Sequence, residues 1–398
     1  MEKSLRYSDY PKEFFLLVIS TLAIFLAYNI SYPILPLYLV SLGAGSPEIG
    51  AIMGALPFIL TLTKLPSGIL AQQSTMKRVL AFSAVGQSIT QVLYWFCPIV
   101  YCFYFAQVFH AVTLAPLVSV GIAASQRMAP VGKRGETMGI YLSGYGIAAA
   151  IGPIICSSLL LFLDYASIFL VSSFLPILGF IPFVFIKASL RLGSQDTSSK
   201  RNVVKELVLL LRSRDVNLVS CLRFLYALTF GFFTTFFVIH AEVNLTLSPS
   251  IITLMLALMG AADLIARFPL GRLLDRIDYK WMLAGSYAVL GALYYVLSEI
   301  RVLSVISITL FLIGLATGVR VTSEWIMLSD SSPKGARSMT SGYMSTIDNI
   351  GRGIGATVGG YVVFLFSIPF GLKIAALTMV VSVLLSAQIR STNAREQG

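Results

Sequence analysis

Long apolar runs, separated by short polar segments, fill almost the whole sequence. We count twelve runs of about 20 residues or more, the length an α-helix needs to cross the ~30 Å hydrocarbon core of a bilayer. Only 12% of the residues are charged, against about 25% in soluble domains. The sequence therefore predicts an all-α membrane protein. The expected helices cover residues 14–42, 46–71, 78–96, 100–127, 136–163, 166–187, 216–241, 247–274, 279–298, 302–329, 336–366 and 369–388.

The two halves of the chain repeat one another. Several residues recur 203 positions later, and the matched pairs are Lys64/Arg267, Pro66/Pro269, Gly68/Gly271 and Lys77/Lys280. A fixed offset of about half the chain length indicates two copies of one unit, here running in the same direction. We therefore predict twelve transmembrane helices in two parallel six-helix repeats. The expected parts are an N-terminal six-helix bundle, a cytoplasmic linker and a C-terminal six-helix bundle, at residues 1–188, 189–215 and 216–398.

The net charge of +11 reflects membrane topology. Most of the Lys and Arg residues lie in the terminal segments and in the polar loops that follow each even-numbered helix. Basic residues concentrate on the cytoplasmic side of membrane proteins. We therefore expect a multi-pass protein of the cell membrane with both termini in the cytoplasm, and no nucleic-acid partner.

Motifs for covalent chemistry are missing from the sequence. It has no phosphate-binding loop of the Gly-x-x-x-x-Gly-Lys type, no His-Glu-x-x-His helix and no Gly-x-Ser-x-Gly elbow. We therefore expect no enzyme activity, no catalytic residue, no metal and no cofactor. The four cysteines lack metal-ligand spacing. Cys97 and Cys102 flank an outer turn, where they either pair or remain separate thiols.

Ionisable residues inside helices gather in the second half. Three acid–base pairs are spaced four residues apart, Asp263/Arg267, Arg320/Glu324 and Asp348/Arg352. This spacing places both charges of a pair on one helix face, and charges within a bilayer are functional candidates. We expect a charge network that either gates transport or only holds helices together. Its expected members are Asp263, Arg267, Gly271, Asp275, Arg276, Arg320, Glu324, Arg337, Asp348 and Arg352.

One polar hairpin resembles a known loop motif. The stretch from Gly271 to Lys280 is similar to the pattern Gly-x-x-x-Asp-Arg-x-Gly-Arg-Lys of the major facilitator superfamily, and it matches at Asp275 and Arg276. It departs where the second glycine of the pattern would stand. In the first copy of the hairpin, Gln72 replaces the acid.

A second motif lies in the fifth expected helix. Gly152 and Pro153 resemble the Gly-Pro motif of the drug:proton antiporter branch of that superfamily, whereas Gln107 stands where the branch carries an arginine. Small residues allow helices to approach closely, and proline bends a helix. The expected helix-packing residues are Gly68, Gly152, Pro153 and Gly355.

The resemblance implies a central cavity lined by the first, fourth, seventh and tenth helices. The candidate cavity residues are Tyr28, Asn29, Tyr32, Gln107, His110, Arg223, Tyr226 and Phe230. This mixture of aromatic and amide side chains suits an amphipathic solute. For His110, a hydrogen bond between helices and a role in the cavity are both open.

These features lead to three functional hypotheses. The first is a secondary active transporter that works by alternating access and exports small amphipathic compounds, with protons as the coupling ion. If protons are coupled, the candidate carriers are Glu324, Asp348 and Asp263. The alternative is uptake or exchange of a polar or anionic organic solute, a sugar or a carboxylate. The third is a membrane sensor that transports nothing. The partners expected for a transporter are a small-molecule substrate and the lipid bilayer.

Overall fold

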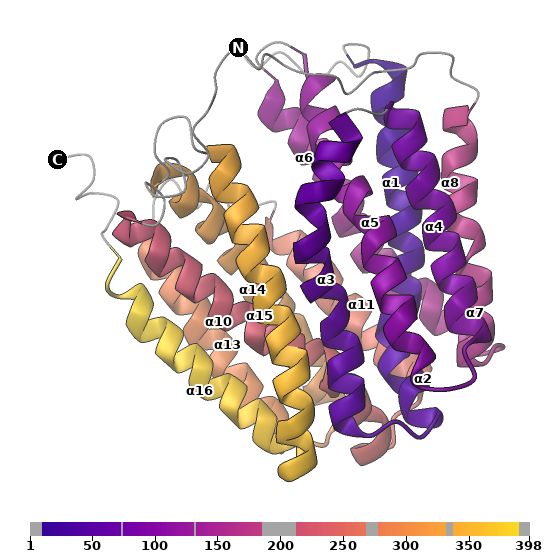
Figure 1. Ribbon diagram of the computed structural model, residues 1–398. Coiled ribbons are helices and arrows are strands. Elements are labelled where there is room, and N and C mark those ends of the chain that lie inside the picture. The colour runs from indigo at the N-terminus through magenta and orange to yellow at the C-terminus, as the bar shows by residue number, and fades with distance from the viewer. Residues whose placement is uncertain are drawn as a thin grey trace, which may run out of the picture. The chain divides into compact units, whose positions relative to one another are not determined.

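The structure is a computed structural model of the chain (Figure 1). It describes residues 10–72, 75–130, 133–184, 212–267, 278–331 and 337–389. The regular elements in these ranges are helices, which confirms the all-α prediction. In the first half they are α1 (Lys12–Ser31), η2 (Tyr32–Ile34), α2 (Leu35–Ser41), α3 (Ser46–Gln72), α4 (Met76–Phe96), α5 (Cys102–Arg127), α6 (Arg134–Leu159), α7 (Tyr165–Ser172) and α8 (Phe174–Val184). In the second half they are α10 (Arg214–Ile239), the π-turn η3 (His240–Asn244), α11 (Pro249–Arg267), α13 (Tyr279–Glu299), α14 (Leu303–Ser331), α15 (Arg337–Leu365) and α16 (Ile368–Ser386).

The helices match the twelve predicted segments, and local sequence explains where they begin and break. Thr75, Asp164 and Ser367 each stand just before a helix and accept a hydrogen bond from a backbone N–H of its first turn, which is how such residues cap helices. The first predicted helix is interrupted by the 3-10 turn η2, which contains Pro33. The sixth is interrupted at Ser173. Both interruptions lie inside continuous apolar runs, so hydropathy alone does not reveal them.

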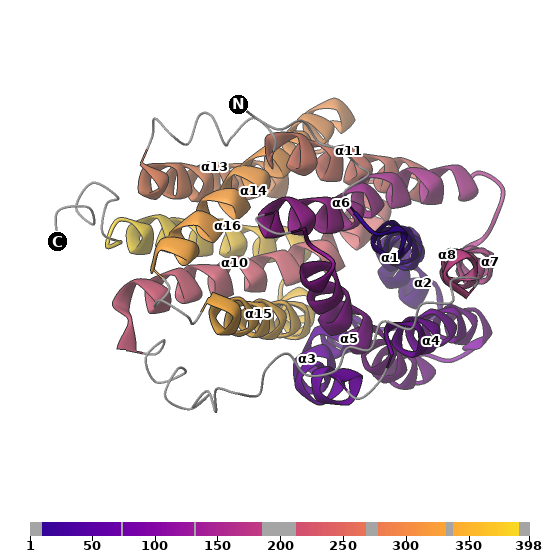
Figure 2. The same cartoon turned by 90° about the horizontal axis from the view of Figure 1, so that it is seen from above.

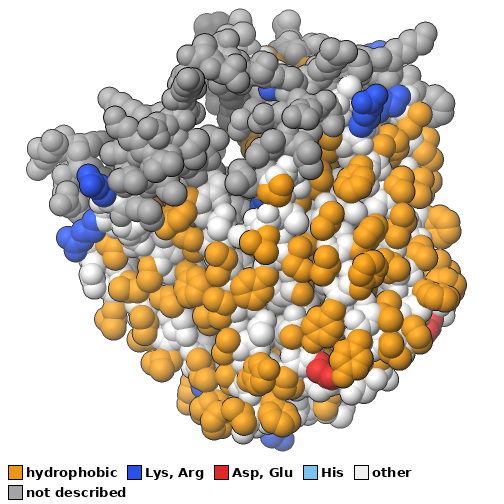
Figure 3. Space-filling view, in the orientation of Figure 1, with side chains coloured by type: hydrophobic (Ala, Val, Ile, Leu, Met, Phe, Trp, Pro, Cys, Tyr) orange, Lys and Arg blue, Asp and Glu red, His pale blue; other side chains and the backbone are white. Residues whose placement is uncertain are grey.

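Ten helical stretches within the described residues are long and apolar enough to cross a membrane. The two predicted spans outside this set are the interrupted pair α7–α8 and the 29-residue helix α15. Asp348, Arg352 and several glycines lower the hydropathy of α15. Hydrophobic side chains cover most of the described surface in Figure 3, as expected where protein meets lipid.

Contacts divide the chain into two compact units. Unit 1 comprises Met1–Leu35 and Ile59–Asp196, and unit 2 comprises Pro36–Phe58 and Thr197–Gly398. In unit 1, α1 packs against α6 and α8, and α4 packs against α5. In unit 2, α10 lies beside α15, α11 beside α14, and α13 beside α14 and α16 (Figure 2). The division into two sequential six-helix bundles with a linker at 189–215 remains a prediction, and residues 185–211 lie outside the described ranges.

Glycines permit the closest helix contacts inside each unit. In unit 1, a Cβ atom on Gly152 of α6 would lie 2.6 Å from Cβ of Asn29 on α1. In unit 2, a Cβ atom on Gly355 of α15 would collide with the backbone carbonyl of Leu228 on α10. These two positions therefore require glycine. Pro153 lies within α6, and Gly68 lies within α3.

Candidate functional site

A cluster of charged side chains joins three helices of unit 2. Arg223 of α10 donates from Nη1 to Glu324 Oε2 of α14 at 2.7 Å. Its Nε atom lies 3.0 Å from Asp348 Oδ1 of α15. Arg320 Nη1 is 2.6 Å from Glu324 Oε1, and Arg352 Nε donates to Asp348 Oδ2 at 2.8 Å. Each carboxylate thus touches two guanidinium groups, and we name these five residues the charge cluster.

Two tyrosines contact the most buried part of the charge cluster. Tyr287 of α13 donates from its hydroxyl to Glu324 Oε1 at 2.9 Å. The guanidinium carbon of Arg320 lies 3.4 Å from the centre of the Tyr226 ring, a cation–π contact. Arg320 is 2% exposed and Glu324 is 3% exposed, so this pair is as buried as the apolar core. An ion pair so buried depends on its neighbours, here Arg223, Tyr226 and Tyr287, although Arg320 Nε has no hydrogen-bond partner among the described residues.

The other side of the charge cluster is more open. The Arg352 guanidinium carbon lies 4.5 Å from the centre of the Phe230 ring, and the Arg352 side chain is 35% exposed. A small recess, with room for about one water molecule, adjoins Arg223 and Glu324 and is also lined by Val219, Trp325, Leu328 and Met344. Water can therefore approach both residues from within unit 2.

The charge cluster is not electrically balanced. Within the described ranges it contains three arginines and two carboxylates, so these five side chains carry one excess positive charge when every member is ionised. An unbalanced charge is costly in a low-dielectric interior. The arrangement is therefore suited to receive an anion.

The remaining members of the predicted charge network fall elsewhere. Asp263 and Arg267 pair with each other on α11 at 2.6 Å, and their side chains are 24% and 43% exposed. Gly271, Asp275 and Arg276 lie outside the described residues. Arg337 begins α15, but its side chain is not among those described. The expected grouping of these residues with the charge cluster remains a prediction.

Unit 1 contains a buried network without charge. The Tyr94 hydroxyl of α4 lies 3.0 Å from Gln107 Oε1 and 2.9 Å from His110 Nδ1, both on α5. Gln87 Nε2 of α4 donates to Thr113 Oγ1 at 2.8 Å. His110 Nε2 and Gln107 Nε2 are buried and have no hydrogen-bond partner among the residues that the structure describes. Two polar atoms of α5 are therefore available to a ligand or to water.

The predicted cavity residues of the first helix surround this network. The Tyr28 ring stacks on Tyr32 at 4.8 Å between centroids and meets the His110 ring edge-on at 5.6 Å. The Asn29 amide donates to the backbone carbonyl of Phe25 at 2.7 Å. Tyr28 thus lies next to His110 and Tyr32 packs on Tyr28, whereas Asn29 bonds within its own helix.

The structure adds residues that sequence reasoning missed. Tyr287 and Tyr94 each form a hydrogen bond with a polar side chain of a neighbouring helix, and Gln87 of α4 donates a hydrogen bond to α5. A tyrosine in an apolar run resembles any other aromatic residue in the sequence. Gln87 gave a usable signal, because an amide in the middle of a membrane span needs a partner. Arg223, predicted as a cavity residue, is also the bridge of the charge cluster.

The fold and the buried polar groups together define a class of protein. Helices of membrane-spanning length enclose a charge cluster in one unit and a neutral polar network in the other, as in secondary transporters. No group of three or more His, Cys, Asp or Glu side chains that could hold a metal occurs in the described part of the chain.

Comparison with known proteins identifies the family. The sequence profile of the Major Facilitator Superfamily matches residues 17–243 and 219–397. The chain belongs to the Major Facilitator Superfamily and is a secondary transporter, not an enzyme. An uncharacterised transporter of this type from Methanocaldococcus jannaschii is 22% identical over 375 residues, which is 93% of this chain and 96% of that protein.

Solved structures of transporters share the fold. A point mutant of the nucleoside transporter NupG superposes with a TM-score of 0.79 and 13% identity, over 94% of this chain and 99% of that chain. A point mutant of the peptide transporter POT, in complex with alafosfalin, has a TM-score of 0.78 and 12% identity, over 97% and 96% of the two chains. At these identities the likeness concerns the fold alone.

Proposed function

We propose that this secondary transporter carries a small amphipathic organic anion, a carboxylate, by alternating access. The observation that carries the proposal is the excess positive charge of the charge cluster, three arginines to two carboxylates. A bound carboxylate balances this charge, so that the occupied cluster is neutral while the protein changes conformation.

Arg223 is the residue best placed to receive the substrate. It adjoins the recess and shares its guanidinium between Glu324 and Asp348. A substrate carboxylate can bind a guanidinium through two hydrogen bonds and thereby displace one protein carboxylate. The rings of Tyr226 and Phe230, stacked at 5.6 Å, receive the apolar part of the substrate.

A second candidate is proton-coupled efflux of amphipathic compounds that carry no negative charge, as in the drug:proton antiporter branch. The stacked Tyr28 and Tyr32 rings favour it, because aromatic faces bind flat apolar groups. Pro153 and Gly152, which carry the resemblance to that branch, lie where α6 touches α1. In this candidate Glu324 carries the proton but no substrate carboxylate binds Arg223.

The proposed site of action is the cell membrane, with both termini in the cytoplasm. The support for this orientation is the distribution of Lys and Arg among the loops.

Flux measurements on purified protein in liposomes test the two candidates. Phenylacetate and phenylacetamide are a suitable pair, because they share shape and differ in charge. The anion proposal predicts protein-dependent flux of phenylacetate or of related carboxylates, and none of the matching amides. Arg223→Gln should abolish this flux. Lys373→Gln, which removes the same charge from a 46%-exposed side chain paired with Glu299, should retain it.

The opposite pattern would refute the anion proposal. Proton-driven accumulation of amides or of organic cations, with no carboxylate flux, supports the efflux candidate. Flux of none of these compounds counts against both candidates.

A further inference from the structure

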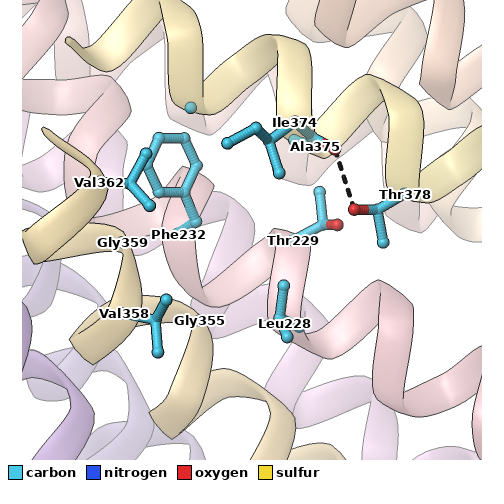
Figure 4. A pocket seen from close by; sticks show the side chains of 11 residues that line it. Leu228, Thr229, Phe232, Gly355, Val358, Gly359, Val362, Ile374, Ala375 and Thr378 are labelled. Atoms are coloured by element: carbon cyan, nitrogen blue, oxygen red, sulfur yellow. Dashed lines mark hydrogen bonds between the residues drawn. The ribbon is translucent and has the colours of Figure 1, made fainter. Parts of the chain in front are cut away.

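A groove with no assigned role lies between α10, α15 and α16, all in unit 2 (Figure 4). The empty space in the groove and at its open side together amounts to ≈ 370 Å³. Three glycines line it, Gly355 and Gly359 on α15 and Gly371 on α16, and each packs closely against an atom of α10. The walls are almost entirely apolar, with Phe232 and Val362 among them.

The open side of the groove belongs to the lipid-facing surface. Val358 and Ile374 on its rim are 53% and 39% exposed, and Leu377 beside it is 64% exposed. Gly371 and Thr378 lie three and ten residues into α16. At ~1.5 Å per residue, the groove runs from roughly 5 to roughly 15 Å below the α15–α16 turn, so it reaches about the middle of the ~30 Å hydrocarbon core. Hydrocarbon of the bilayer is therefore the medium outside it.

One polar atom in the groove is unpaired. The Thr229 side chain is fully buried, and its hydroxyl has no hydrogen-bond partner within the described ranges of the chain. Thr234, Thr235 and Thr378 instead donate to the carbonyl four residues earlier at 2.9 Å, the usual solution for threonine in a membrane helix. Figure 4 shows the Thr229 side chain on the groove side of α10, across from Thr378. A buried hydroxyl without a partner costs free energy.

We propose that this groove binds a lipophilic molecule that carries one hydrogen-bond acceptor, such as a ketone or ester carbonyl, and that enters from the bilayer. The apolar body of the ligand lies against the apolar walls of the groove, and the Thr229 hydroxyl donates to its carbonyl oxygen. A plain acyl chain fills the space but leaves this hydroxyl unpaired. A strongly polar solute is excluded by the apolar walls. The groove shares no residue with the charge cluster, so the proposal does not depend on the transported substrate.

Photolabelling of the full-length protein in lipid nanodiscs tests the proposal. The probe is an alkyne-tagged benzophenone, which is itself a lipophilic ketone and forms covalent bonds with nearby C–H groups under light. We expect saturable labelling of peptides from α10, α15 and α16. Unlabelled benzophenone should compete about 5-fold better than diphenylmethane, which lacks the carbonyl, since one hydrogen bond contributes about 1 kcal/mol.

Three variants distinguish the contribution of the Thr229 hydroxyl to binding from that of the groove's empty space. Thr229→Val keeps the shape and should abolish the preference for the ketone, while ligand-free protein stays folded. Thr235→Val is the matched control, because its hydroxyl already bonds the Gly231 carbonyl, and it should keep the preference. Val362→Trp fills the groove from its rim and should remove the labelling.

Two results would overturn the proposal. Equal competition by benzophenone and diphenylmethane in the unaltered protein would mean that the groove does not recognise a carbonyl group and binds only hydrocarbon such as an acyl chain. Labelling that does not saturate, maps to other helices or survives Val362→Trp would show that the groove is not a binding site.

Discussion

Arg223 Nη1 lies 2.7 Å from Glu324 Oε2, although 101 residues separate the two in the sequence. The same guanidinium is 3.0 Å from Asp348. Arg223, which the sequence predicts only as a cavity residue, therefore contacts two members of the predicted charge network. A solute that binds Arg223 would also disturb these ion pairs.

The net charge of the cluster determines how its variants rank in stability. Arg223→Gln brings the cluster from +1 to 0 and removes two contacts with carboxylates, so we expect it to lower the free energy of unfolding by about 1–3 kcal/mol. Glu324→Gln brings it to +2 and leaves Arg320 and Arg223 poorly compensated, so we expect a loss of about 3–5 kcal/mol. Thermal unfolding of the purified variants measures the difference.

Two further variants control this ranking. The double variant Arg223→Gln/Glu324→Gln returns the cluster to +1 and should be no less stable than Glu324→Gln alone. Arg267→Gln breaks an exposed pair and should cost less than about 1 kcal/mol. A larger loss for Arg223→Gln than for Glu324→Gln would contradict the charge argument.

The neutral network of unit 1 predicts a separate effect. Tyr94→Phe removes the hydroxyl that lies between Gln107 and His110. Both partners stay buried without it, so the free energy of unfolding should fall by about 1–3 kcal/mol. Tyr295→Phe alters a side chain that is 55% exposed and should change it by less than about 0.5 kcal/mol. Equal melting temperatures for the two variants would mean that the network does not stabilise unit 1.

Packing of α15 on α10 predicts that replacing two different glycines of α15 by alanine has opposite effects on the free energy of unfolding. Gly355→Ala places a methyl group against the Leu228 carbonyl, and such overpacking costs about 1–3 kcal/mol. Gly342→Ala meets nothing within 4 Å and should stabilise the helix by up to about 1 kcal/mol. Melting temperatures of the two variants measure the contrast. A neutral Gly355→Ala would show that the two helices can move apart at little cost.

Single-cysteine labelling tests the proposed orientation. Lys77 and Lys280 are the second residues of α4 and α13, at positions matched by the 203-residue offset, whereas Arg301 lies in the turn between α13 and α14. In intact cells, an impermeant maleimide should label Arg301→Cys but neither Lys77→Cys nor Lys280→Cys in a background without other cysteines. Opposite accessibility of the two lysine positions would refute the parallel repeats.

Cys97 should react slowly, and its reactivity should rise with pH. Burial and the neighbouring Cys102 thiol raise the pKa of Cys97 to about 12. Only about one molecule in 10⁴ then carries the reactive thiolate at pH 8. Its rate of alkylation by iodoacetamide, followed by peptide mass spectrometry, should increase about tenfold for each pH unit between 8 and 10. Rapid alkylation of the folded protein at pH 7 would contradict the buried, protonated thiol.

Some of the charge cluster could be predicted from the sequence. The pairs Arg320/Glu324 and Asp348/Arg352 form as their spacing of four residues predicts, because that spacing places two side chains on one helix face. The bridge from Arg223 and the anchor from Tyr287 could not be predicted. They depend on how α10 and α13 are rotated against α14, and helix rotation in a bilayer follows from side-chain packing.

The sequence by itself determined the helices, their number and the residues that share a face, because hydrophobic length and helical periodicity are properties of consecutive residues. It also predicted the parallel repeat, since a constant offset is visible without coordinates. Only the tertiary structure decided which charges meet, which hydroxyl stays unpaired and where a groove opens. Those outcomes depend on contacts between residues distant in the sequence, such as Gly355 and Leu228. The close packing of two helix surfaces allows only one rotation and spacing of the helices, and this cannot be read from consecutive residues.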